Sequence, residues 1–180
     1  ALPTLLLGVV GLQAALGMWT VTLLLKPLIV TLHLLGGMTT LALLVAMSIK
    51  EADYAPATDG SEQKLRLPAA IALLAVIAQI ALGGWVSSNY AALACPDFPT
   101  CQGQWQPAMD FAQAFTLHRE LGFTGDGRLL SGEALTAIHW SHRLGALAVL
   151  LAVGALALAL LRASRGRWRP WGMALLGLLA

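Results

Sequence analysis

The sequence predicts an all-α fold, a bundle of membrane-spanning helices, and three observations support that prediction. Of the 180 residues, 58% are hydrophobic and only 11% are charged, whereas a soluble domain has about 25% charged residues. The apolar residues are gathered into runs of about 20, the length that crosses a bilayer as a helix. Few charges interrupt these runs, and a helix satisfies its own backbone hydrogen bonds in lipid.

Four complete apolar runs are long enough to span: Thr4–Leu25, Leu28–Ile49, Leu67–Ser88 and Leu135–Leu161. A fifth run begins at Trp171 and is too short to span before the sequence ends. The sequence starts at Ala1, with no Met and no basic stretch before the first run. We therefore expect an interior piece of a longer protein and infer no signal peptide. The net charge of +2 does not suggest nucleic-acid binding.

The basic residues predict an orientation. Two linkers on one side of the predicted membrane carry Lys50, Lys64, Arg66, Arg162, Arg165, Arg167 and Arg169. The opposite side carries Lys26, Arg119 and Arg128. Because basic loops stay in the cytoplasm, the long loop from about Asn89 to Glu133 is expected outside. That side is the periplasm for a bacterial inner membrane, or the intermembrane space for a mitochondrial one.

The long loop contains both cysteines, in the segment CPDFPTC. Cys95 and Cys101 lie on the oxidising side, where a disulfide is plausible. It could be a structural staple or a redox-active pair. In Pro107–Leu121 the spacing of the phenylalanines suggests a short helix on the membrane surface. An aromatic belt at the outer boundary explains Trp19, Trp85, Trp105 and Trp140.

A short pattern occurs twice along the chain. QAALGMWTV (13–21) and QIALGGWV (79–86) share Q-x-A-L-G-x-W, and HLLGG (33–37) and HRLGA (142–146) share H-x-L-G-small. A helix followed by a histidine-bearing helix is therefore used twice, as in membrane proteins built by duplication. Small residues after each histidine allow close approach of a second helix or of a flat ligand.

The paired histidines are the first candidates for function. Ionisable groups inside membrane helices are rare and usually mark function. His33 and His142 lie at similar depths in their helices, about 7–11 Å from the same edge. Two such imidazoles suit axial ligation of haem iron. The alternative is that each histidine hydrogen-bonds a neighbouring helix.

Two further residues accompany His142. His139 is three positions earlier and shares its helical face. It would support the ligand, carry a proton, or simply lie at the interface. Arg143 points about 100° away, and it reaches either the lipid head groups or a haem propionate. In the outer loop, His118 is expected to be solvated or interfacial.

Three segments, QAALGMWTVTLLLKPLIVTLHLLGG, GGWVSSNYAALACPDFPTCQGQW and IHWSHRLGA, closely resemble haem A synthases of the proteobacterial and mitochondrial type. The resemblance covers essentially all 180 residues, although CPDFPTC alone is not specific. It implies an eight-helix protein made of two four-helix halves. Residues 1–66 would close the first half, with two helices and a cytoplasmic linker. Residues 67–180 would begin the second half.

The resemblance also implies roles for the candidate residues. His33 resembles the fourth-helix ligand in the first half, where haem O is oxidised to haem A. His142 resembles the sixth-helix ligand in the second half, which holds a haem b cofactor, and His139 and Arg143 lie beside it. Cys95 and Cys101 match the outer-loop cysteine pair. The remaining ligands and the catalytic glutamate lie outside this chain, so no catalytic residue is assigned here and the piece alone is expected to be inactive.

The expected partners are membrane lipid, with a haem O synthase, an electron donor and a second copy of the protein as further candidates. Two rival functions use the same residues differently. A b-type cytochrome would transfer electrons through the histidines without a substrate. A quinone-linked disulfide oxidoreductase would use Cys95 and Cys101 and leave the histidines unexplained. A structural assembly subunit, with hydrogen-bonded histidines and no pigment, is the non-enzymatic alternative.

Overall fold

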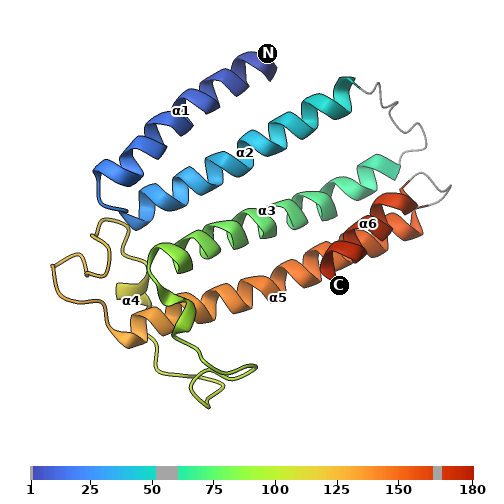
Figure 1. Ribbon diagram of the computed structural model, residues 1–180. Helices are drawn as coiled ribbons and strands as arrows, with labels where there is room; N and C mark the ends of the chain where they lie inside the picture. The colour runs from blue at the N-terminus through green and yellow to red at the C-terminus, as the bar shows by residue number, and fades with distance from the viewer. Residues whose placement is uncertain (1, 52–60, 164–167) are drawn as a thin grey trace. The chain divides into compact units, whose positions relative to one another are not determined.

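The computed structural model describes residues 2–51, 61–163 and 168–180, and the described chain is all-α apart from two isolated β-bridges (Figure 1). Its long helices are α1 (Leu2–Thr22), α2 (Pro27–Glu51), α3 (Ser61–Ser88) and α5 (Gly132–Arg162). These four have the length and composition to cross a membrane, as the apolar runs predict. The shorter helices are η1 (Ala91–Leu93), α4 (Phe111–Ala114) and α6 (Arg169–Leu179).

The chain divides into two compact units, Ala1–Asp53 with Ile80–Arg143, and Tyr54–Gln79 with Leu144–Ala180. The first unit holds α1, α2, the C-terminal part of α3, the long loop and the start of α5. Both candidate histidines and both cysteines belong to this unit. The division into halves at residues 66 and 67 stays a prediction. Arg165 and Arg167 of the predicted cytoplasmic linkers, and residues 52–60, lie outside the described residues.

Helix α1 ends three residues earlier than the hydropathy predicts because the backbone turns at Leu24 and Leu25. Both residues have positive φ, 54° and 57°. The N–H of Leu25 bonds the carbonyl of Thr20, and the N–H of Leu24 bonds the carbonyl of Val21. This is the Schellman pattern of a helix C-terminus, built without the usual glycine. The chain then re-enters helix at Pro27, the first position of α2, where a missing N–H has no cost.

Helices α1 and α2 pack as an antiparallel hairpin (Figure 1), and much of their apolar surface faces outward. Leu7 and Val21 of α1, for example, are 73% and 74% exposed. Helices with apolar residues on every side are typical of membrane spans. Lipid would cover such side chains, so their exposure agrees with the multi-pass architecture.

The buried core of the first unit lies where α3 ends and α5 begins. It consists of Trp85, Val86, Ala91, Ala114, Ala134, Ala137 and Ile138. Trp85 is 5% exposed, and its indole N–H donates a 2.8 Å hydrogen bond to the carbonyl of Ala114. The prediction that an aromatic belt explains Trp85 is therefore wrong, since this indole is buried within the protein. Trp19 and Trp105 are exposed, as such a belt requires.

The long loop is mostly irregular, and its helical part is shorter than the sequence suggests. Within Pro107–Leu121 only Phe111–Ala114 is helical, with Asp110 as N-cap accepting from the N–H of Gln113. The rings of Phe111 and Phe115 stack with centroids 6.5 Å apart. Ser131 caps the start of α5 by accepting from the N–H of Ala134, which is a common role for serine.

Candidate functional site

The His33 imidazole lies in the seam between α1 and α2, directly over Gly17. A methyl group added to Gly17 would lie 3.2 Å from Cε1 and 3.6 Å from Nε2 of His33. Such a contact is tighter than ordinary van der Waals separation, so a larger residue would displace the ring. The glycine of the first Q-x-A-L-G-x-W motif therefore makes room for the histidine of the first H-x-L-G motif.

The His142 imidazole has the same arrangement on the second copy of the motif. A methyl group added to Gly83 would lie 3.3 Å from Cε1 of His142. Gly83 occupies the same motif position as Gly17, and His142 the same position as His33. The two short sequence repeats thus correspond to two imidazole–glycine contacts with nearly equal spacing.

His33 carries a polar atom that the described protein does not satisfy. Its Nδ1 is buried and has no hydrogen-bond partner among the described residues. Nε2 of Gln13, on α1, is also buried and has no hydrogen-bond partner among the described residues. Buried polar atoms normally find a partner, so such exceptions require an explanation. For His33 the alternative of a hydrogen bond from Nδ1 to a neighbouring helix is not realised in this part of the chain.

The chemistry of His33 fits an axial ligand of haem iron. A neutral imidazole nitrogen binds iron without placing a charge in the membrane, and the Gly17 contact restricts the ring position. Over residues 2–51, 61–163 and 168–180, no group of three or more His, Cys, Asp or Glu side chains could hold a metal ion by itself. A ligand that brings its own four equatorial nitrogens, as a haem does, needs only single histidines.

The small residues after His33 are not an open slot. A methyl group added to Gly36 would overlap the side-chain amide of Gln13. A methyl group added to Gly37 would lie 3.9 Å from the oxygen of the same amide. The Gln13 side chain therefore crosses α2 in the space that Gly36 provides. A methyl group added to Gly84 of α3 would lie 3.0 Å from the Leu34 side chain and 3.3 Å from the Thr31 side chain, both on α2. Glycines thus bring both α1 and α3 close to α2.

Arg143, one residue after His142, holds the disulfide loop. Its Nη1 donates to the carbonyl oxygens of Asp97 at 2.7 Å and Thr100 at 2.8 Å. Its Nη2 donates to the carbonyl oxygen of Cys95 at 2.9 Å, and its Nε to Nε2 of His139 at 3.3 Å. These contacts use four of the five N–H donors of a guanidinium. In this arrangement a haem propionate would find one free N–H, on Nη2.

His139 also faces the disulfide loop. Its Nδ1 accepts from the backbone N–H of Cys95 at 3.3 Å, while its Nε2 faces the Nε–H of Arg143 at 3.3 Å. A neutral imidazole has one acceptor nitrogen, so each tautomer can accept only one of these two hydrogen bonds. A protonated ring would accept neither. This geometry uses His139 to join α5 to the loop.

The loop itself is closed by the disulfide between Cys95 and Cys101, with Cα atoms 4.6 Å apart. Both cysteines are buried, at 4% and 0% exposure. The Asp97 carboxylate accepts from the Thr100 hydroxyl and from the backbone N–H groups of Gly103 and Gln102. The hydroxyl contact is the largest cause holding the pKa of Asp97 below its usual range, and the backbone donors act in the same direction.

Arg119 is a buried residue that the sequence did not single out. It is 5% exposed, and its guanidinium lies 5.5 Å from the centre of the Trp85 ring. Its Nη2 and Nη1 donate long hydrogen bonds to the carbonyls of Ala114 (3.3 Å) and Phe123 (3.4 Å). Burial lowers the pKa of Arg119. A single basic residue in a loop gives no periodic pattern in the sequence. The burial of Arg119 against Trp85 can therefore be recognised only in the fold.

Comparison with known proteins settles the family. The model of the cytochrome oxidase assembly protein family COX15-CtaA matches residues 1–180. The chain belongs to the haem A synthase family. The "Heme A synthase" of Shewanella oneidensis is 40% identical over 147 residues, which cover 81% of this chain and 44% of that protein. The chain therefore spans less than half the length of this curated haem A synthase. No solved structure matches the chain.

Membership in the haem A synthase family confirms the family that the three motifs predict. The matching family is described as one of cytochrome oxidase assembly proteins, and neither comparison supports a quinone-linked disulfide oxidoreductase. In this family context the two imidazole–glycine contacts are the most specific chemical feature of the described residues.

Proposed function

We propose that the complete protein is a haem A synthase, which oxidises a ring methyl of haem O to a formyl group in an oxygen-dependent reaction. The family match over residues 1–180 supports this, as does the 40% identity to a protein named "Heme A synthase". The observation that carries the proposal in the structure is the partly buried His33 ring, whose buried Nδ1 has no partner among the described residues.

The two histidines serve different haems in this proposal. His33 binds the substrate haem O, and His142 binds a haem b cofactor that supports electron supply or structure. Bound haem supplies a redox-active iron. The protein contributes a neutral ligand nitrogen and a fixed ring position, which Gly17 and Gly83 determine by their close contact with the imidazoles.

The complete protein consists of two similar halves in this proposal. Support comes from the repeated motifs and from the matched spacing of the two imidazole–glycine contacts, 3.2 and 3.3 Å. Each haem would receive its second axial ligand from a part of the family sequence that this chain does not cover. The catalytic glutamate would lie there as well.

The orientation follows from charge. The described basic residues of the predicted cytoplasmic linkers are Lys50, Lys64, Arg66, Arg162 and Arg169. With these in the cytoplasm, the disulfide loop lies on the oxidising side, where its bond is stable. A haem O synthase would deliver the substrate, an electron donor would supply reducing equivalents, and a second copy of the protein would complete a homo-oligomer.

Pigment analysis of the complete protein tests the function. The protein is produced in membranes that make haem O but no haem A, and haems are extracted and separated. Haem A should appear only when the complete protein is present, and His33→Ala should abolish it. A b-type cytochrome would contain haem b and leave the haem O pool unchanged, so that pattern would replace the enzyme with the electron-transfer function.

A further inference from the structure

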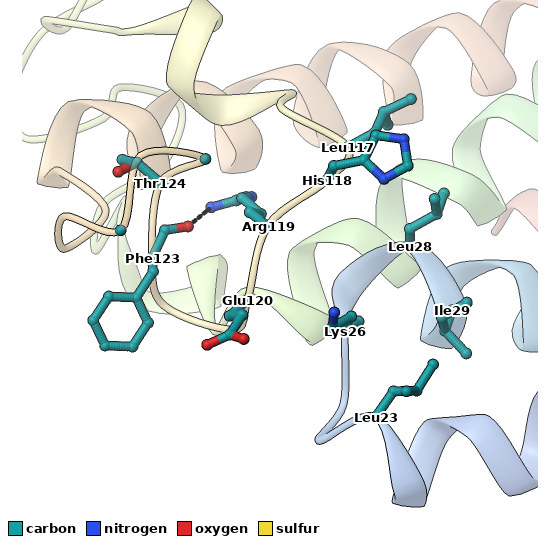
Figure 2. A pocket seen from close by; sticks show the side chains of 12 residues that line it. Leu23, Lys26, Leu28, Ile29, Leu117, His118, Arg119, Glu120, Phe123 and Thr124 are labelled. Carbon is teal, nitrogen blue, oxygen red and sulfur yellow. Dashed lines mark hydrogen bonds between the residues drawn. The ribbon is translucent and has the colours of Figure 1, made fainter.

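A cavity of about 590 Å³ opens where the α1–α2 turn meets the outer loop. Figure 2 shows Leu23, Lys26 and the first residues of α2 on one side of it. The loop segment that includes His118, Arg119 and Glu120 forms the other side. The cavity lies wholly within the first compact unit.

The cavity is built to accept negative charge. Lys26 and Arg119 line it, and Glu120 is the acidic residue of the lining. Among the described residues, neither Lys26 nor Glu120 forms an ion pair. The first intrahelical bond of α2 is from the N–H of Val30 to the carbonyl of Lys26. The preceding N–H groups at this helix N-terminus are therefore unpaired and carry partial positive charge.

Arg119 provides the second, independent observation. Arg119 is only 5% exposed, and its Nε has no hydrogen-bond partner among the described residues. Burying a cation without a counterion is costly, and the lowered pKa of Arg119 has desolvation as its cause. An anion in the cavity would compensate this charge.

The cavity lies at the end of the seam that contains His33. His33 faces Gly17 across the α1–α2 pair, while Leu23, directly after the end of α1, and Ile29 of α2 line the cavity. Ile29 and His33 are four residues apart, so they share a face of α2. Lys26 is seven residues from His33, about 10 Å along the helix. An anionic group in the cavity is thus one to two helical turns from the imidazole.

We propose that this cavity binds the carboxylate edge of the tetrapyrrole substrate, with Lys26 and Arg119 as its cationic contacts. The proposal rests on the proposed function, since it assumes that His33 binds the substrate iron. A lipid phosphate shares the anionic chemistry, but the placement of the cavity on the His33 seam favours a ligand that reaches both points.

Binding of iron(III) protoporphyrin and of its dimethyl ester to the complete protein tests the proposal. The signal used is the spectral change that His33→Ala removes. Lys26→Gln should weaken binding of the free acid about tenfold, or about 1.4 kcal/mol, and leave the ester unchanged. Lys26→Arg should restore most of the affinity. Arg128→Gln, in an exposed pair with Asp126, should change neither.

Equal effects of Lys26→Gln on the acid and the ester, or no effect on either, would overturn the cavity assignment while leaving the His33 site intact. Loss of bound phospholipid in Lys26→Gln, with unchanged porphyrin affinity, would assign the cavity to lipid instead. If the wild-type protein shows no His33-dependent porphyrin signal, the proposed function itself fails, and the cavity proposal fails with it.

Discussion

Nη2 of Arg143 donates a 2.9 Å hydrogen bond to the carbonyl oxygen of Cys95, although the two residues are 48 positions apart in the sequence. Together with the contacts to Asp97 and Thr100, this bond ties the disulfide loop to α5. His142, the candidate haem ligand, is the adjacent residue. The loop and the ligand are therefore positioned by the same turn of helix.

Arg143→Lys should loosen the disulfide loop although it preserves the charge. A lysine ammonium cannot reproduce the planar guanidinium fork that reaches three carbonyls at once. Each lost charged hydrogen bond contributes about 1.5–3 kcal/mol, so we expect about 2–4 kcal/mol of loop stability to be lost. Limited proteolysis of the outer loop measures this effect. Arg128→Lys is the matched control because its pair with Asp126 is 75% and 57% exposed, and equal protection in both variants would refute the role of Arg143.

Cys95 and Cys101 should resist thiol reagents until a reductant is added. They are bonded to each other and have 4% and 0% exposure, so reductants and alkylating agents reach them only when the loop opens. Mass spectrometry after alkylation of the non-reduced protein checks this. Labelling of both cysteines before reduction would show that the native protein holds them as thiols.

Gly17→Ala should disturb the His33 site. The added methyl group would lie 3.2 Å from Cε1 of His33, and relieving an overpacked contact of this kind costs about 1–3 kcal/mol. We expect about tenfold weaker haem O binding, which corresponds to about 1.4 kcal/mol, and a shifted absorption spectrum of the bound haem. Spectroscopic titration measures both.

Gly11→Ala provides the control on the same helix, because no atom lies within 4 Å of a methyl group added there. It should bind haem O as the wild type does. Similar titrations for Gly17→Ala and Gly11→Ala would mean that the imidazole–glycine contact does not set the ring position.

The stability of the disulfide loop should fall in acid through Asp97. Its hydrogen bonds from Thr100 and the nearby backbone lower the pKa of this carboxyl in the folded state. The stabilisation is therefore present above the unfolded-state pKa and is lost as the pH falls through the folded-state pKa. Proteolysis with an acid-active protease between about pH 6 and pH 2 measures loop opening. Asp97→Asn should flatten the profile, and an unchanged profile would exclude Asp97 as its source.

The sequence predicts the helices well because membrane spans are determined by local composition. The four apolar runs match α1, α2, α3 and α5 within a few residues at most boundaries. The largest difference is at the start of α3, which begins at Ser61, six residues before the apolar run. The difference of three residues at the end of α1 has a local cause, the left-handed turn at Leu24 and Leu25, which a pair of leucines does not predict. The disulfide was also suggested by the sequence, because the distribution of basic residues predicts that the loop lies on the oxidising side.

The loop contacts were not predictable because they join distant segments. The Trp85 indole pairs with Ala114, 29 positions away, and the resulting burial cannot be inferred from the position of a tryptophan near a helix end. The sequence predicts that Arg143 reaches the lipid head groups or a haem propionate, and it gives Arg119 only as a charge in the outer loop. Their partners are mainly backbone carbonyls, which carry no residue-specific signal in the sequence.

The haem content of two variants of the complete protein tests the central claim, that His33 and His142 bind different haems. The reduced-minus-oxidised spectrum and the extracted haems are compared for the wild type, His33→Ala and His142→Ala. His142→Ala should lose haem b, while His33→Ala should keep haem b and lose conversion of haem O to haem A. A normal low-spin haem b spectrum in His142→Ala, or an unchanged yield of haem A in His33→Ala, would contradict the account.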